Sequence, residues 1–505
     1  MKKEYGKEKG SVTIFVSLVM LLVASLLFTM LESARVPGLK TKADMNAMLS
    51  AESVFAEYQP ELWERYDLLY LDLGYGEQRI DLTRLKERIL ILNQENLNPK
   101  GSGLPGIRAD MYRMNVTQCV VEEYELATDD GGAAFFSQAV ESMKNEITYQ
   151  AAQKIYEKIS NTKEVEETAD NPEGKMEEAE VMIRTERERK AEENRQRMEQ
   201  GEEVQPLEEV ENPVEIVKEQ KTSGILTQVV ENPGQLSVKA INLSDSVENR
   251  QKQCGNSSGY YAKGFYERIV YQKYLQKYFG CYTAPGQDDV LDYELEYLLA
   301  GKASDQENLE SAVYRILAVR MAANLLSLFG DAVKMNEALT VATALVGFTG
   351  NPAIIELAKS GILVAWAYAE SIVDIRTLLG GGKLPLIKTS EDWETSLDHI
   401  SEAFGGNIRA REREDGFSYQ DYLQKMLYFQ NQEQLNYRAM NVMEKNIRIW
   451  SGNPNICMDS MTQKMKLTVS YEASPLFFRL VTIGDVSDEA YQFTQEKEIS
   501  YLNSR

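Results

Sequence analysis

The sequence predicts an α+β protein that is mostly α-helical, with one N-terminal transmembrane helix and a helical ectodomain core that carries a small antiparallel sheet. Three observations predict this fold class. Residues 12–31 form an uncharged apolar run, residues 265–385 repeat apolar side chains at helical spacing, and residues 112–120 and 465–471 alternate apolar with polar side chains. The 505 residues allow two or three domains, and 43% of them are hydrophobic, which is enough for a packed core.

The run from Val12 to Leu31 has the length of a membrane-spanning helix, because roughly 20 residues rising about 1.5 Å each cross a hydrocarbon layer about 30 Å thick. A buried core helix is disfavoured, since such helices rarely stay apolar on every face. A cleaved secretory signal is also disfavoured, because its apolar region is only about 7–15 residues long and Glu32–Arg35 is a poor cleavage site. An uncleaved anchor is expected.

The charges around this helix set its expected orientation by a narrow margin. Four lysines precede it, and three basic residues follow it, namely Arg35, Lys40 and Lys42. Because the preceding tail is short and the following part is long and acidic, we expect the tail inside and the bulk of the chain extracytoplasmic, on a single-pass anchor in the cell membrane. The net charge of −23 repels phosphate backbones, so nucleic acid is not an expected partner, whereas the membrane bilayer is.

The expected organisation has six consecutive segments. They are a cytoplasmic tail or leader (1–10), the transmembrane helix (11–32), membrane-proximal helices and a strand (33–160), a charged low-complexity insertion (161–220), a helical core (221–450) and a β-rich C-terminal segment (451–505). Pro37 and Gly38 predict a bend between the transmembrane helix and a second helix over 39–58. The insertion holds 20 acidic and 9 basic residues, which predicts a solvated single helix or a disordered segment.

The helical core begins with clear signals. Ser304-Asp305-Gln306-Glu307 is a capping box, and Leu309 starts the apolar face of the helix that follows it. Two further helices, over 338–348 and 354–375, are joined by Gly350-Asn351-Pro352. The first is too short to cross a membrane and the second carries Glu356 and Lys359, so both are expected in the core. We also expect the two alternating stretches to form strands of one sheet.

The sequence predicts no enzyme, no catalytic residue, no cofactor and no metal site. His399 is the single histidine and no GxSxG motif is present, so we expect a structural role for it. Two Gly-Lys pairs lack the rest of a phosphate loop. The acids between Asp288 and Glu296 lack a calcium-loop spacing and fit a helix N-terminus. Four cysteines without CxxC spacing favour free or buried thiols over one or two disulfides (Cys119, Cys254, Cys281, Cys457).

Several stretches resemble known families. Lys9–Phe15 and Leu31–Val36 resemble the N-termini of TadE/TadG-like pseudopilins, accessory proteins of tight-adherence (Flp-type) pilus systems. A broader set of stretches is similar to an uncharacterised family of single-pass proteins of Gram-positive bacteria, a domain of unknown function carried alongside such systems; these are residues 53–58, 62–69, 212–226, 293–302, 365–370 and 383–389. The resemblance implies a non-enzymatic envelope protein, an accessory or pseudopilin-like component whose partners are pilus or secretion machinery.

The same resemblance makes Gly10 and Ser11 a candidate leader-peptidase site, because Lys7-Glu8-Lys9-Gly10-Ser11 places basic residues and a glycine directly before the apolar helix. Pilins carry Glu at the fifth position after that glycine, and this chain has Phe15 there. A membrane-resident accessory role is therefore favoured over packing in a filament. The alternative function is an extracytoplasmic enzyme or binding module of unknown substrate on the same anchor.

Overall fold

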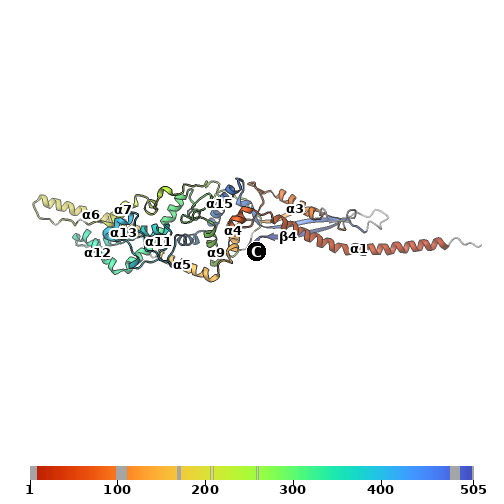
Figure 1. The fold of residues 1–505 in the computed structure, drawn as a ribbon, viewed down its shortest axis with the longest axis horizontal. Helices are drawn as coiled ribbons and strands as arrows, with labels where there is room; N and C mark the ends of the chain where they lie inside the picture. Colours follow the sequence, from red (N-terminus) through yellow and green to blue (C-terminus); the bar gives the residue numbers. More distant parts are fainter. Residues whose placement is uncertain are drawn as a thin grey trace, which may run out of the picture. The chain divides into compact units, whose positions relative to one another are not determined.

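The computed structural model describes residues 8–97, 111–167, 172–204, 206–208, 210–257, 259, 261–477 and 490–502 (Figure 1). It is 61% helix and 10% strand, with a small antiparallel sheet and a long apolar N-terminal helix, which confirms the predicted fold class. The chain forms two compact units. Unit 1 contains Met1–Gln138, Gln251–Tyr261 and Trp450–Arg505, and unit 2 contains Ala139–Arg250 and Ala262–Ile449. Each unit is thus assembled from segments that are far apart in sequence, whereas the sequence predicted consecutive segments.

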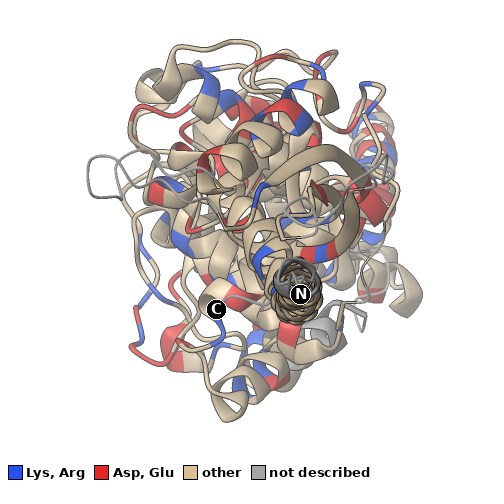
Figure 2. Cartoon of the chain, turned by 90° about the vertical axis from the view of Figure 1, so that its right-hand side faces the viewer, with Lys and Arg blue, Asp and Glu red and all other residues tan. Residues whose placement is uncertain are grey.

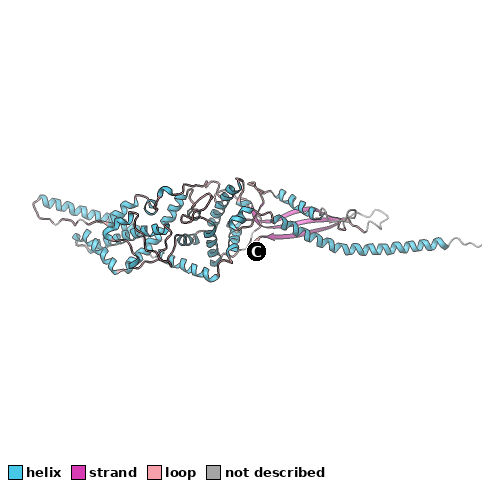
Figure 3. Ribbon diagram, viewed as in Figure 1, coloured by secondary structure: helices cyan, strands magenta, loops and turns pink. Residues whose placement is uncertain are grey.

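Unit 1 combines a long helix with the sheet (Figure 3). Its elements are α1 (Glu8–Phe55), α2 (Pro60–Tyr66), β1 (Leu71–Asp72), α3 (Leu82–Leu97), β2 (Met114–Leu126), the first part of α4 (Asp129–Met143), the 3-10 turn η5 (Met458–Ser460), β3 (Met461–Ala473) and β4 (Tyr491–Ser500).

The sheet is antiparallel and β3 is its central strand. β2 pairs along one edge of β3, from Met114 opposite Ala473 to Leu126 opposite Thr462. β4 pairs with β3 from Lys464 to Ala473, and β1 pairs with its first two residues. The two strands expected from alternation are therefore neighbours in one sheet, as predicted. Both are longer than the alternating stretches, because their ends lack a strict polar and apolar alternation.

The core of unit 1 lies between α1, α3 and the inward face of β3. Every second residue of β3 points inward, and α1 presents small residues every fourth position, so that helix and sheet approach closely. The buried residues that form this core include Leu39, Ala43, Ala47, Ala51 and Phe55 of α1, Leu85 and Ile89 of α3, and Met465, Leu467, Val469 and Tyr471 of β3.

The predicted bend at Pro37 and Gly38 does not separate two helices. α1 is one helix of 48 residues with Pro37 inside it. Proline removes only one backbone hydrogen bond of the helix, and contacts on both sides of it hold the chain in place. Before it, Arg35 is bonded to Glu32 and to Ser474, and after it Leu39 is fully buried against the sheet.

Unit 2 is helical, and α13 is at its centre, in contact with α6, α7, α8, α11, α12 and η4. Its elements are the rest of α4, α5 (Tyr149–Glu167), α6 (Pro172–Glu199), α7 (Pro213–Lys221), α8 (Ile225–Val229), η1 (Pro233–Gln235), α9 (Phe265–Tyr278), α10 (Glu294–Ala300), α11 (Asp305–Gly330), α12 (Ala332–Val346), η2 (Gly347–Thr349), α13 (Pro352–Leu379), η3 (Ser390–Asp392), η4 (Leu397–Phe404), α14 (Tyr419–Tyr428) and α15 (Gln432–Ser451), which ends in unit 1.

The core helices are those that the sequence predicted. Ser304 and Glu307 form both bonds of the capping box at the start of α11. Asn351 caps α13 through the backbone N–H of Ala353, and Gly380 follows the last residue of that helix. The residues from Gly361 to Leu379 are all buried, so α13 is a core helix as expected.

The charged insertion is mostly helical where the structure describes it; the second half of α6 is largely exposed, as a solvated helix would be, whereas its first half packs on the core. The insertion contributes the end of α5, all of α6 and most of α7, and α6 packs on α13. Met176, Ala179 and Ile183 are buried on one face of α6, with spacings of three and four residues. The approach is close, because a Cβ added to Gly361 of α13 would lie 2.3 Å from the Cβ of Ala179. Three apolar residues on one face are thus enough to pack α6 on α13, although most residues of the segment are polar.

Candidate functional site

The first half of α1 is the most distinctive surface of the described chain. The helix is long and apolar enough to cross a membrane, and none of its most apolar window is buried. Its large side chains point outward all around the axis; Phe15 is 66% exposed and Leu22 is 67% exposed. Figure 2 looks at α1 from its N-terminal end, where the described residues of the apolar stretch carry neither acidic nor basic colour. Soluble proteins rarely expose so large a contiguous apolar surface, so this half is a candidate membrane-spanning segment.

A second helix passes the same test of length and hydropathy. It is α11, which is 67% buried over its most apolar window. Because its apolar residues face the core of unit 2, they are already removed from water, and α11 needs no membrane to cover them.

At the end of the apolar stretch, a pair of charges joins α1 to the sheet. Glu32 is 1% exposed, and its carboxylate accepts hydrogen bonds from the backbone N–H groups of Leu476 and Phe477 at 3.1 and 2.8 Å. Arg35 pairs with Glu32 at 2.5 Å and donates to the backbone carbonyls of Met111, Tyr112 and Ser474. We call Glu32 and Arg35 the junction pair. It fixes α1 to one end of the pair of strands β2 and β3, where β2 begins and β3 ends.

Further along α1, a second polar cluster holds the helix against α3 and the sheet. Asn46 donates to the side chain of Asn93 at 2.9 Å, and Asn93 donates to Ser50 at 2.7 Å. Tyr471 of β3 donates to the same Asn93 oxygen. These hydrogen bonds converge on the buried Asn93 side chain, so α1, α3 and β3 are held in one register.

Gly10 and Ser11 lie in the first turn of α1, directly before the exposed apolar half. The side chain of Ser11 is outside the described residues. The candidate leader-peptidase site at these two residues stays a prediction.

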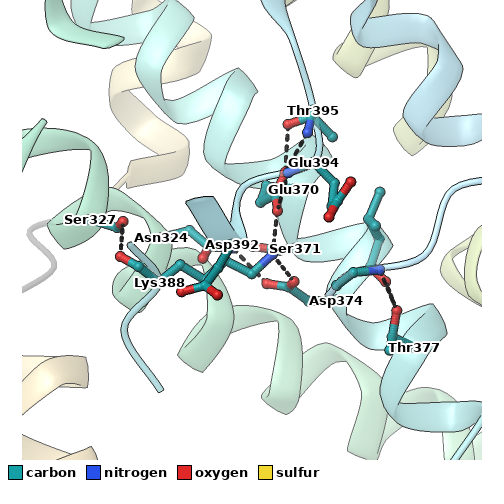
Figure 4. A network of polar contacts seen from close by, with 12 residues as sticks. Asn324, Ser327, Glu370, Ser371, Asp374, Thr377, Lys388, Asp392, Glu394 and Thr395 are labelled. Carbon is teal, nitrogen blue, oxygen red and sulfur yellow. Dashed lines mark hydrogen bonds and ion pairs between the residues drawn. The ribbon is translucent and has the colours of Figure 1, made fainter. Parts of the chain in front are cut away.

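Unit 2 contains a buried charge network that joins α11, α13 and the segment after α13 (Figure 4). Arg320 donates to one oxygen of Asp374 at 2.7 and 2.9 Å. Lys388 pairs with the other oxygen of Asp374 at 2.5 Å and with Glu370. Glu370 also accepts from the backbone and hydroxyl of Thr395 at 2.9 and 2.7 Å. All four charged side chains are 0% exposed.

The network carries two positive and two negative charges, so its net charge is zero. Burial alone would raise the pKa of Asp374, but Arg320 and Lys388 lower it below its usual value. Burial would likewise lower the pKa of Lys388, but Asp374 and Glu370 raise it. Because no group of the network reaches the surface, a substrate has no access to it, and its role is to hold the helices together.

Two buried acids lie on α10. Glu294 accepts from the N–H of Gly280 at 2.9 Å and from Asn446 at 2.8 Å. Glu296 accepts from the N–H of Tyr282 at 2.9 Å and from the hydroxyl of Tyr419 at 2.6 Å. Burial raises the pKa of Glu294 to about 8 and that of Glu296 to about 7. The neighbouring Asp292 turns instead to Lys239, at 2.7 Å. These acids of the stretch from Asp288 to Glu296 are thus divided among separate partners.

The remaining sequence candidates do not come together. His399 is exposed and lies in η4, where its φ of −134° departs from helical geometry. The four cysteines are free, with Cys254 exposed and the other three buried, as the spacing predicted. Gly301 of one Gly-Lys pair ends α10 in a left-handed conformation.

Sequence reasoning missed the junction pair and the buried charge network. Glu32 and Arg35 entered the prediction through the cleavage site, the flanking charge and the family resemblance and not as a pair, although a charged pair at the end of an apolar helix is itself a signal. The network had a similar signal, since Arg320 and Asp374 stand within helices whose neighbouring residues are apolar.

These features define a class: a mostly α-helical protein with a small antiparallel sheet and one unpartnered apolar helix at its N-terminus. A family comparison gives the particular family. Residues 203–473, just over half of the chain, match the family of unknown function DUF5702, and the chain belongs to that family. The match confirms the expected domain of unknown function; it ends at the last residue of β3. No curated protein and no solved structure matches the chain.

Proposed function

We propose that this protein is a single-pass envelope protein, anchored by the first half of α1 with its short tail in the cytoplasm and both units outside. The observation that carries the proposal is the contrast between the two halves of one continuous helix. Residues of the first half expose apolar side chains in every direction, whereas Leu39, Ala43 and Ala47 of the second half are buried in unit 1. Lipid would cover the first half.

We further propose that the protein is a non-enzymatic accessory or pseudopilin-like component of a tight-adherence pilus or secretion system of a Gram-positive bacterium. Support comes from the resemblance of Lys9–Phe15 and Leu31–Val36 to TadE/TadG-like N-termini. The continuous helix adds support, because it joins the proposed anchor directly to unit 1. Phe15 at the position of the pilin Glu favours a membrane-resident role.

The test of the pilus role has two readouts on the native protein. Mass spectrometry of the N-terminus from purified membranes distinguishes a chain that starts at Met1 from one that starts at Ser11. Shearing the cells then shows whether the protein leaves with surface filaments. We expect the protein to stay with the membrane after shearing. We also expect its gene to lie beside the genes of a secretion ATPase and an assembly platform. A gene without such neighbours would contradict the pilus role.

A second candidate function is a binding module on the same anchor, and one observation favours it. Unit 2 contains a pocket of about 360 Å³ whose lining is mainly polar and includes Glu231, Asn232, Gln235, Tyr282 and Tyr293. Such groups suit a small hydroxyl-rich molecule. Calorimetric titration with simple cell-wall sugars would test this function, and binding lost in a Tyr282→Ala variant would favour it.

A further inference from the structure

One end of the sheet in unit 1 reaches back along α1 into its apolar half. The aromatic rings of Phe28 and Phe477 stack with centroids 6.2 Å apart and planes 15° apart. Phe28 lies three residues before Leu31, the end of the apolar run, which is about 4.5 Å along a helix axis. The segment after β3 is therefore level with the last turn of the apolar run.

The junction pair lies at the same level, and its bonding suits a place with little water. The guanidinium of Arg35 donates hydrogen bonds to Glu32 and to three backbone carbonyls, at 2.7 Å to Met111 and 3.1 Å to Ser474. The side chains of Arg35 and Glu32 are 6% and 1% exposed. Charges in a low-dielectric surrounding are stable only when partners satisfy them, whereas charges in water need no such set.

Around the junction pair, the surface is apolar and aromatic. Met111 is 49% exposed and Tyr112 is 44% exposed, and both lend their carbonyls to Arg35. Leu476 and Phe477 are half-buried on the same side of α1. We call Phe28, Met111, Tyr112, Leu476 and Phe477 the rim. Aromatic side chains of this kind are enriched where a membrane meets water.

We propose that the rim lies in the membrane interface, in contact with lipid, at the end of the apolar half of α1. The inference rests on the proposed membrane anchor and adds that unit 1 is seated on the bilayer rather than tethered to it. Lipid is the occupant that the structure favours, because the rim is continuous with the exposed apolar surface of α1. The junction pair and the Asn46–Asn93 contact fix α1 to the sheet. When the first half of α1 spans the bilayer, the rim is therefore held at the bilayer surface.

Tryptophan variants of the full chain in phosphatidylcholine vesicles test this seat. The vesicles carry either ordinary acyl chains or chains brominated near the glycerol, which quench tryptophan in contact with them. The measured quantity is the emission of each variant minus that of the native chain, which has four tryptophans. The probe at the rim is Phe477→Trp, and Phe15→Trp in the apolar half reports on the anchor.

Ile91→Trp is the matched control in the same unit. Ile91 is 51% exposed on α3 and lies two residues from Asn93. Asn93 contacts Asn46 of α1, which is 14 residues beyond Glu32, or about 21 Å along the helix. Ile91 is therefore far from the rim. We expect Phe15→Trp and Phe477→Trp to lose most of their added emission in brominated vesicles, and Ile91→Trp to lose none. Adding Arg35→Ala should restore the emission of Phe477→Trp while Phe15→Trp stays quenched.

The outcomes separate the two claims. If Phe15→Trp is not quenched, the proposed anchor fails. If Phe15→Trp is quenched and Phe477→Trp is not, the anchor stands and the seat on the bilayer is overturned; protection of that tryptophan from an aqueous quencher would then mean that a protein covers the rim. Quenching of Ile91→Trp would also overturn the proposal, because unit 1 would then lie along the bilayer.

Discussion

Removing the Lys388 ammonium group should destabilise unit 2 strongly. In Lys388→Met, Asp374 and Glu370 remain buried with Arg320 as the only cation of the network, so a net negative charge is left at positions that are 0% exposed. Breaking a buried ion pair by removing one partner costs about 3–5 kcal/mol, because the remaining charge cannot recover its hydration. The apolar side chain of methionine returns only part of this cost.

The assay is urea unfolding of the full chain in detergent, followed by tryptophan fluorescence. Trp366 is one turn before Glu370 and donates to Thr395, a partner of Glu370, so its emission reports on this core. Lys383→Met is the matched control, because Lys383 is exposed in the same segment. The double variant Glu370→Gln with Lys388→Met should recover part of the loss, since Arg320 and Asp374 then balance. A loss below about 1 kcal/mol for Lys388→Met, or an equal loss for Lys383→Met, would refute the reasoning.

Three further results are expected. The free energy of unfolding should fall as the pH rises from about 4.5 to about 8, because Glu294 and Glu296, with pKa values of about 8 and 7, keep protons that the unfolded chain releases. The charges of Asp289 and Asp305 also raise the pKa of Glu294. The free energy of unfolding should change by up to about 1.4 kcal/mol per pH unit for each acid. Glu294→Gln should reduce this slope, whereas Glu391→Gln should leave it unchanged. Gly361→Ala should cost about 1–3 kcal/mol by forcing α6 away from α13, whereas Gly330→Ala meets no atom within 4 Å and should be neutral in thermal unfolding. Asn93→Ala should cost about 1–3 kcal/mol in urea unfolding by removing the side-chain hydrogen bonds of Asn93 with Asn46, Ser50 and Tyr471; an equal effect of Asn96→Ala would argue against the buried cluster.

Local patterns predicted the elements of this fold well. The apolar run of α1, the alternation in β2 and β3, and the capping box of α11 each depend on residues that are close in sequence. The pairing of β2 with β3 followed from the same alternation, because two half-buried strands need a common core. Pro37 misled the prediction, since the cost of one lost backbone bond is small beside the contacts that keep α1 one continuous helix against the sheet.

Features that depend on distant residues could not be predicted. Arg35 bonds to a carbonyl 439 residues away, and Arg320 pairs with Asp374 across 54 residues. No local pattern records such partners. In α6 the average composition did not indicate a packed face, because the three apolar residues that contact α13 are few among many charged ones. The interleaving of the two units along the chain has the same origin, since it follows from long-range pairing of β3 with β2.

The central claim is that the first half of α1 holds the protein in a membrane, and carbonate extraction tests it most directly. Carbonate strips proteins that are held by charge and leaves those whose apolar segments cross the bilayer. Since α1 exposes an uncharged apolar surface from Val12 to Leu31, the intact chain should remain in the membrane pellet after high salt and after carbonate. Recovery of the intact chain in the soluble fraction would contradict the account.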